Sequence, residues 1–157
     1  MSDEPTVREA RIDDAAPAMA LVRRSIVRLC QLDHGGDRPT LEGWLANKTI
    51  ESMEHWIERP GTTVFVAERQ GALGGVGAVT DQGEILLAYV DPGHRFQGLT
   101  KSLVARMEEH ARDLRAERMQ LTVTETARSF FTSLGYVPDD EPGDIFGNDE
   151  NVLVKPF

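Results

Sequence analysis

Cysteine is nearly absent from this sequence of 157 residues, in which Cys30 is the single example. An internal disulfide is therefore excluded, and a lone thiol fits a reducing compartment. Long apolar runs are missing too, since none approaches the roughly 20 residues of a membrane-spanning helix. The opening residues MSDEPTVREAR are charged and lack the apolar core of a secretory signal. We therefore expect a cytoplasmic protein with no membrane partner.

Positive charge is also scarce. The sequence has 17 Lys and Arg residues against 26 Asp and Glu residues, which gives a formal net charge of −9. Such a chain has no basic face that would neutralise phosphates, so we exclude general nucleic-acid binding. A cationic substrate such as an amine is compatible with this charge. The acidic stretch 139–150 holds no Lys or Arg, and we interpret it first as a solvated loop and second as an attractor of cations.

The rest of the composition is that of an ordinary globular domain, with 40% hydrophobic and 27% charged residues. The sequence shows no repeat, no low-complexity tract and no linker between domains. We therefore expect one domain that covers residues 1–157.

Hydrophobic periodicity predicts the elements of the first third of the chain. A short strand is expected at 6–10, followed by a helix that Asp13 or Asp14 caps. One or two short helices follow between residues 40 and 59, with Thr40 as the candidate cap.

The period changes to that of β-strands after residue 61. Turns at 69–71 and 81–83 divide the stretch into three strands, which predicts an antiparallel meander. The third strand, ILLAYV at 85–90, is apolar on both faces, so we expect it at the centre of a sheet. The glycines of GGVG, 74–77, lie inside this meander and indicate a bulge or close contact rather than a phosphate loop.

The last third alternates helix and strand. A helix is expected at about 98–114, a strand at 118–123, a helix over 124–136 and a closing strand at 151–157. The strand–helix–strand order predicts a parallel, right-handed crossover. In the first of these helices we expect a buried stripe and an exposed ion pair, Glu108 with Arg112. The stripe consists of Leu99, Leu103, Met107, Ala111 and Leu114.

The stretch DPGHRFQGLTKS, residues 91–102, has the residue types of an anion site at a helix N-terminus. Gly98 allows the backbone to approach a bulky anion, and the first amides of the helix lack partners. Arg95 and Lys101 add positive charge, while Thr100 and Ser102 add hydroxyl donors. The lysine motif GxxxxGK[ST] is absent. The residues alone therefore predict a ligand that carries a pyrophosphate.

The segment YVDPGHRFQGLTKSLVARMEEHA resembles motif A of the GCN5-related N-acetyltransferase (GNAT) family, which uses acetyl-CoA. Thr100 stands where this motif usually has Gly or Ala, and its hydroxyl can itself face the phosphates. The segment TARSFFTSLGYVP resembles a later motif of the family, and VLVKPF resembles its last strand. The residues that fit are Arg95, Phe96, Gln97, Gly98, Leu99, Ala127, Phe130, Gly135 and Tyr136.

This resemblance implies an α/β domain with a mixed, mostly antiparallel sheet flanked by helices. It implies that strand 85–90 splays from strand 118–123 and that pantetheine lies in the gap, against the backbone of Ala88 and Val90. It also implies direct transfer of an acetyl group from acetyl-CoA to an amine. The implied cofactor-binding residues are Ala88, Tyr89, Val90, Arg95, Phe96, Gln97, Gly98, Leu99, Thr100, Lys101, Ser102, Thr124, Ala127, Phe130 and Phe131.

The acid–base residues match the family only in part. Glu84 stands where one branch of the family has its general base, and an ammonium substrate needs such a base. The tyrosine that usually protonates the leaving thiolate is replaced by Phe131, and a neighbouring asparagine by Thr124. Tyr136, Tyr89 or solvent are the remaining proton donors. Two functions stay open: an N-acetyltransferase, and a domain that binds or senses acyl-CoA without catalysis.

The acceptor is expected to be a small-molecule amine, with a protein lysine or N-terminus as the alternative. The resemblance places one wall of the acceptor cleft on the helical segment that precedes the meander. A metal site is not expected, because Cys30, His34 and Asp37 match no zinc pattern. A homodimer is left open. The candidate acceptor residues are Asp33, Asp37, Trp44, Glu51 and Glu54.

Overall fold

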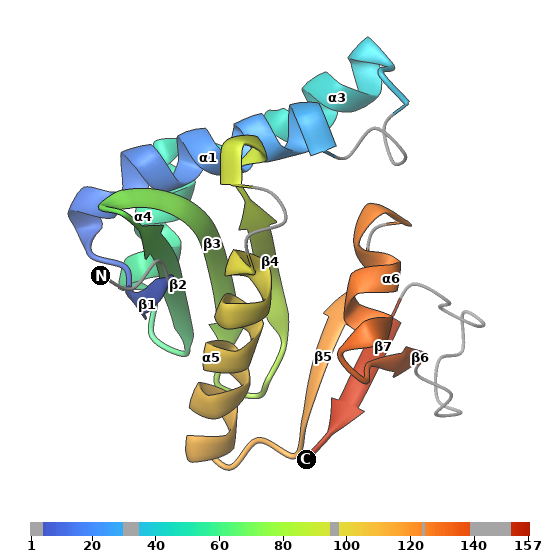
Figure 1. Cartoon of the computed structure of the whole chain (residues 1–157). Coiled ribbons are helices and arrows are strands. Elements are labelled where there is room, and N and C mark those ends of the chain that lie inside the picture. Colours follow the sequence, from blue (N-terminus) through green and yellow to red (C-terminus); the bar gives the residue numbers. More distant parts are fainter. Residues whose placement is uncertain (1–4, 30–34, 95–97, 124, 139–151) are drawn as a thin grey trace.

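Two antiparallel sheets lie side by side in the computed structural model, which describes residues 5–29, 35–94, 98–123, 125–138 and 152–157 (Figure 1). The first sheet has the order β1-β2-β3-β4 and the second the order β5-β7-β6. The strands are β1 (Thr6–Glu9), β2 (Thr62–Arg69), β3 (Ala72–Thr80), β4 (Ile85–Val90), β5 (Arg118–Thr122), β6 (Val137–Pro138) and β7 (Val152–Pro156).

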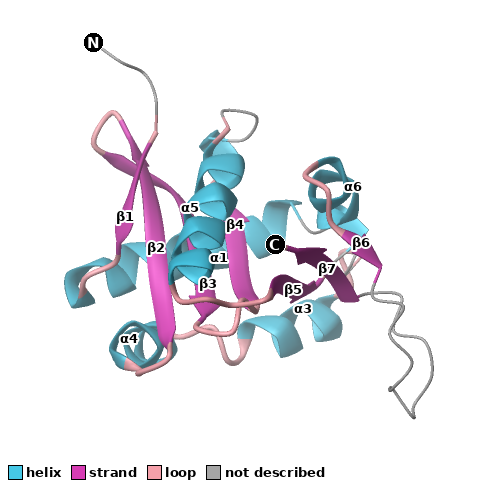
Figure 2. Ribbon diagram, turned by 90° about the horizontal axis from the view of Figure 1, so that it is seen from below, coloured by secondary structure: helices cyan, strands magenta, loops and turns pink. Residues whose placement is uncertain are grey.

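Helices cover the first sheet on both faces, and α6 lies beside the second sheet (Figures 1 and 2). Two 3₁₀ turns join strands to helices, η1 (Ile12–Asp14) and η2 (Pro92–His94). The α-helices are α1 (Ala15–Leu29), α3 (Arg38–Leu45), α4 (Ile50–Glu58), α5 (Leu99–Asp113) and α6 (Glu125–Ser133).

The two faces follow from the alternation of side chains along β2. Phe65 and Ala67 are buried in a cluster with Leu103 of α5. Val64 and Val66 belong to a second cluster with buried residues of α1 and α4. The first sheet is therefore the middle layer of a sandwich, with α5 on one side and α1 with α4 on the other.

The predicted antiparallel meander is confirmed, but β4 lies at an edge rather than at the centre of a continuous sheet. β4 pairs with β3, and its contact with the second sheet is an isolated parallel bridge from Glu84 to Gln120. The bridge shows that β4 and β5 run parallel, as expected. The apolar character of β4 on both faces is explained by the helix layers rather than by a strand on each side.

The glycines of β3 let α5 approach the sheet closely. A Cβ atom at Gly75 would lie 2.8 Å from Leu103 Cδ1, and one at Gly77 would lie 3.0 Å from Met107 Cε. Both distances are shorter than ordinary packing allows. The interpretation of GGVG as a strand with a close contact, not a phosphate loop, is thereby confirmed.

Several local predictions were wrong. The cap of α3 is Asp37, whose carboxylate accepts a hydrogen bond from the Thr40 N–H, so Thr40 is not the cap. Leu114 follows the end of α5 and is 47% exposed, so it is not part of the buried stripe. Glu108 pairs with Lys155 of β7 at 3.1 Å, and the Arg112 guanidinium lies over the ring of Phe157 instead of pairing with Glu108.

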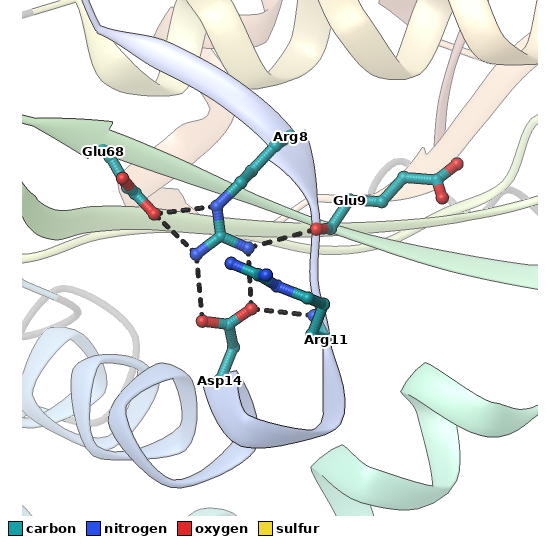
Figure 3. A network of polar contacts seen from close by, with 5 residues as sticks. All are labelled: Arg8, Glu9, Arg11, Asp14 and Glu68. Atoms are coloured by element: carbon teal, nitrogen blue, oxygen red, sulfur yellow. Dashed lines mark hydrogen bonds and ion pairs between the residues drawn. The ribbon is translucent and has the colours of Figure 1, made fainter.

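The β1 edge of the first sheet is covered by a network of charged side chains (Figure 3). Arg8 of β1 donates to Asp14 of η1 at 2.8 Å and to Glu68 of β2. Asp14 also accepts a hydrogen bond from the Arg11 N–H at 2.7 Å, and this carboxylate, predicted as one of two candidate caps of α1, thus binds residues that precede that helix. The hydrogen bond from Arg8 holds the pKa of the Asp14 carboxyl below its usual range.

Candidate active site

A cleft separates β4 from β5, and Gly83 closes one end of it. The Gln120 N–H donates to the Gly83 carbonyl at 2.9 Å, beside the Glu84–Gln120 bridge. Gly83 has a φ of +93°, and a Cβ there would lie 2.1 Å from the Arg118 carbonyl oxygen. A side chain at this position would push the strands apart, so glycine is what allows them to meet.

Beyond this junction the strands diverge and leave a cleft of about 70 Å³, the β4–β5 cleft. Most of its lining residues have apolar side chains. An elongated apolar ligand arm with polar amide groups would match such a cleft. The lining residues are Ile85, Leu86, Leu87, Ala88, Tyr89, Leu121, Thr122, Val123, Ala127 and Phe131.

The register of β4 directs two of its backbone units into this cleft. The Asp91 N–H donates to the Gly74 carbonyl at 2.8 Å, which makes Asp91 and Gly74 a hydrogen-bonded pair. Hydrogen-bonded and non-hydrogen-bonded pairs alternate along an antiparallel ladder. Val90 opposite Gly75 and Ala88 opposite Gly77 are therefore non-hydrogen-bonded pairs, and their N–H and C=O groups point away from β3.

The N-terminus of α5 presents a second set of backbone donors, which we call the α5 mouth: Gly98 and the amides of Leu99, Thr100 and Lys101. Gly98 is the N-cap residue, with a φ of +77°, and none of the described side chains caps the helix. The first intrahelical bond at this end runs from the Ser102 N–H to the Gly98 carbonyl at 3.1 Å. A Cβ at Gly98 would meet no atom within 4 Å. The mouth is thus open, uncapped and positive in potential, as an anion site requires.

The predicted residues of the α5 mouth differ in what they offer. Leu99 is buried in the core beneath the helix, so only its amide can face a ligand. Thr100 and Ser102 are half-buried, and Lys101 is exposed. Arg95, Phe96, Gln97 and Thr124 lie outside the described residues and stay as predictions.

The structure places Phe131 and Ala127 of α6 on the cleft wall, opposite β4. Phe131 is only 2% exposed, and its ring meets Phe130 and Tyr136 edge-on, with centroid distances of 5.1 and 5.3 Å. The position where the family resemblance implies a proton donor thus carries a fixed hydrocarbon ring. Tyr89 also lines the cleft and is half-buried.

The surroundings of Tyr136 argue against it as the proton donor. It is fully buried and is not among the residues that line the β4–β5 cleft. Its hydroxyl has no hydrogen-bond partner among the described residues, and Lys155 lies 5.6 Å from its ring centroid. Burial, and then the nearby Glu108 carboxylate, raise the pKa of Tyr136. The Tyr136 hydroxyl is therefore buried in the core and does not form part of the cleft wall.

Glu84 lies at the closed end of the cleft, next to the lining residue Ile85. The Glu84 N–H donates a hydrogen bond to the Thr80 hydroxyl oxygen at 3.1 Å, and the Glu84 carbonyl accepts one from the Thr80 N–H at 2.9 Å. The side chain is exposed. The backbone of Glu84 is therefore fixed while its carboxylate is open to solvent.

The acceptor candidates are not brought together. Glu51 and Glu54 lie on α4, which packs behind β2, two strand positions or about 10 Å from β4 (Figure 1). Asp37 is occupied as the cap of α3, and its hydrogen bonds with Thr40 lower the pKa of its carboxyl. Asp33 and the side chain of Trp44 lie outside the described residues. α3 itself lies near the end at which β4 and β5 are farthest apart, whereas α4 does not.

The described part of the chain holds neither a cluster of metal ligands nor a membrane-spanning helix. No group of three or more His, Cys, Asp or Glu side chains there is arranged to hold a metal ion. None of the helices described is long and apolar enough to cross a membrane.

Solved structures with this architecture define its class. A GCN5-related N-acetyltransferase from Rhodopseudomonas palustris superposes with a TM-score of 0.82 at 22% identity, over 100% of this chain and 99% of its own. The PaiA N-acetyltransferase of Thermoplasma acidophilum, solved with coenzyme A, gives 0.81 at 17% identity, over 98% and 99%. The yncA structure from Salmonella typhimurium, solved with acetyl-CoA, gives 0.66 at 21% identity, over 96% and 91%. The fold is that of the GCN5-related N-acetyltransferases.

The sequence then shows the family itself. A family model described as an acetyltransferase (GNAT) domain matches residues 36–146, well over half of the chain. The protein belongs to the GNAT family of N-acetyltransferases, as the two motifs predicted. No curated protein sequence matches the chain.

Proposed function

We propose that this chain transfers an acetyl group from acetyl-CoA to a primary amine of a small molecule. The supporting observation is that the uncapped α5 mouth lies at the end of a strand whose backbone groups at Ala88 and Val90 face the cleft. The mouth suits a pyrophosphate, and the strand edge suits an amide-bearing arm. Acetyl-CoA carries both groups in one molecule. The CoA complexes of the PaiA and yncA proteins support this choice of donor.

The proposed base is Glu84. Bound acetyl-CoA supplies a thioester carbonyl that an amine can attack, and the amine must first lose its extra proton. The exposed Glu84 carboxylate can take this proton. Glu84 lies four residues before Ala88 along the strand, roughly 13 Å, so the proposal routes the proton through water.

The leaving thiolate departs without help from the wall residue Phe131, which has no proton to give. A CoA thiol resembles that of cysteine, with a pKa of about 8.5, so the thiolate is a tolerable leaving group near neutral pH. Solvent then protonates it. Phe131 is also the observation that favours the second candidate function, acyl-CoA binding without catalysis.

The base is tested with Glu84→Gln and with Asp81→Asn as the matched control in the neighbouring turn. Glu84→Gln should lower kcat about a hundredfold, the usual contribution of a positioned base, and leave the Kd for acetyl-CoA unchanged. Asp81→Asn should change neither quantity. An unchanged kcat in Glu84→Gln would remove Glu84 from the mechanism.

The donor site is tested by calorimetric titration of acetyl-CoA into the wild type, Gly98→Asn and Gly98→Asp. Asn and Asp have the same shape and both tolerate a positive φ, so the pair isolates the charge. Gly98→Asp should bind at least about tenfold more weakly than Gly98→Asn, because a carboxylate at the mouth opposes the pyrophosphate. Equal affinities, or a wild type that binds no acetyl-CoA, would contradict the proposed donor.

A panel of small amines with acetyl-CoA distinguishes the two candidate functions. Turnover of any small amine supports the transferase with a small-molecule acceptor. Binding of acetyl-CoA with no turnover over a broad panel would favour the sensing domain, and turnover on lysine-containing peptides alone would favour a protein acceptor.

A further inference from the structure

The η2 turn, which directly follows β4 and Asp91, is held by the two oxygens of one carboxylate. Asp91 directly follows β4, and its N–H is bonded to the Gly74 carbonyl of β3 at 2.8 Å. Its Oδ1 accepts a hydrogen bond from the Gly93 N–H at 2.9 Å, which closes the η2 turn. The side chain of Asp91 is 17% exposed, so it is largely shielded from water.

The second oxygen binds an arginine from a distant part of the sequence. Arg24 Nη2 on α1 lies 2.6 Å from Asp91 Oδ2. A charge-assisted hydrogen bond of this length is among the stronger side-chain contacts. α1 is thereby tied to the start of the segment that leads to Gly98.

The ion pair is not needed to hold α1 on the sheet. That contact is made by buried apolar residues, Leu21, Val22 and Ile26 of α1 in one cluster with Val76 and Leu87 of the sheet. Arg24 itself is 47% exposed at the side of the helix. Removal of the Arg24 side chain would therefore leave the apolar core intact and take away only the contact with Asp91.

We propose that Arg24 is a positioning residue for the donor site, acting through Asp91 to preset the η2 turn and with it the position of the α5 mouth. This inference rests on the proposed acetyl-CoA site. Backbone amides bind an anion well only if they already point in the right direction, because ordering them on binding costs free energy. A turn that populates the competent geometry less often binds proportionally more weakly.

The test compares Arg24→Gln, Arg24→Lys and the control Arg23→Gln. Arg23 is the preceding residue on α1, but it donates to the carbonyls of Leu45 and Lys48 and does not contact the turn. Arg24→Gln should raise the Kd for acetyl-CoA about three- to fivefold, the range expected for loss of a partly exposed ion pair. Arg24→Lys keeps the charge and should stay close to wild type, and Arg23→Gln should leave the Kd unchanged.

The kinetic readout separates positioning from general damage. With acetyl-CoA saturating, kcat should be equal in Arg24→Gln and wild type, and only the KM for acetyl-CoA should rise. Asp91→Asn provides a second route, because an amide keeps the oxygen for the Gly93 N–H but loses the charge. The double variant Arg24→Gln/Asp91→Asn should bind no more weakly than the weaker single variant, since both remove one contact.

The outcomes are distinct. A wild type that binds no acetyl-CoA overturns the proposed function and this inference with it. A wild type that binds, with Arg24→Gln binding equally well, overturns the inference alone. Equal weakening by Arg23→Gln, or additive losses in the double variant, would also overturn it, because either result assigns the effect to α1 in general.

Discussion

The two edges of the first sheet are protected in opposite ways. The β1 edge is short and carries Arg8, which binds Asp14 and Glu68 at the rim of the sheet (Figure 3). The β4 edge is apolar and is approached by β5, which touches it through the bridge at Gln120. Exposed edges invite unwanted pairing, and charge is a common defence. The β4 edge is instead covered by the second sheet. Because β5 contacts β4 at only one end, the rest of this edge lines the β4–β5 cleft.

Among the substitutions that test this comparison, Gly83→Ala should have the largest effect. It places a side chain at the junction where β5 covers the β4 edge. The new Cβ would meet the Arg118 carbonyl carbon and oxygen, at 3.2 and 2.1 Å, in a backbone with a φ of +93°. We expect a loss of at least about 3 kcal/mol in the free energy of unfolding, measured by urea denaturation.

Gly71→Ala is the matched control for this substitution. Gly71 has a similar φ of +80°, but a Cβ there would meet nothing within 4 Å. Only the backbone strain remains, so the expected loss is about 1 kcal/mol. Equal losses at both positions would mean that the contact with Arg118 is relieved cheaply.

A pair of prolines tests which backbone groups of β4 face the cleft. Proline removes one N–H and is tolerated where that N–H makes no ladder bond. Ala88→Pro should fold and bind acetyl-CoA about tenfold more weakly, because one donor to the arm is lost. Tyr89→Pro removes a bond to β3 and should lower the melting temperature sharply. Circular dichroism and calorimetry check both, and the opposite order would contradict the assigned register.

The smallest effect is expected at the charged edge. The pKa of Asp14 is lower in the folded chain than its unfolded value near 3.9, so its contribution is complete above about pH 5 and is lost as the pH falls through the folded pKa. Asp14→Asn should cost up to about 1 kcal/mol at pH 7, and the gap to wild type should close in acid. A gap that is independent of pH would assign the effect to packing.

The elements of this fold were predictable because their signals are local. The meander, the position of α5 and the closing strand β7 all follow from periodicity and turn residues within a few positions. The Asp37 cap was also within reach, because an Asp two residues before Pro39 is a common helix start. The preference for Thr40 overlooked that signal.

The contacts that shape the site were out of reach because they join distant residues. Nothing near Gly83 in the sequence indicates that the Arg118 carbonyl will lie against it. Arg24 and Asp91 are 67 positions apart, and an arginine on a helix is most often solvated. The burial of Tyr136 away from the cleft likewise depends on how α5, α6 and β7 pack together. The sequence indicated which residues contribute to the site, but tertiary packing determines which of them are in contact.

The strands β4 and β5 diverge from the junction at Gly83. A small change of the angle between them at this junction is therefore amplified toward their far ends. β4 has six residues and is about 20 Å long, so a tilt of about five degrees at the junction moves its far end by nearly 2 Å. That displacement is comparable to the length of one carbon–carbon bond. Substitutions beside Gly83, at the end of β4 opposite the α5 mouth, can therefore change the width of the β4–β5 cleft at its open end.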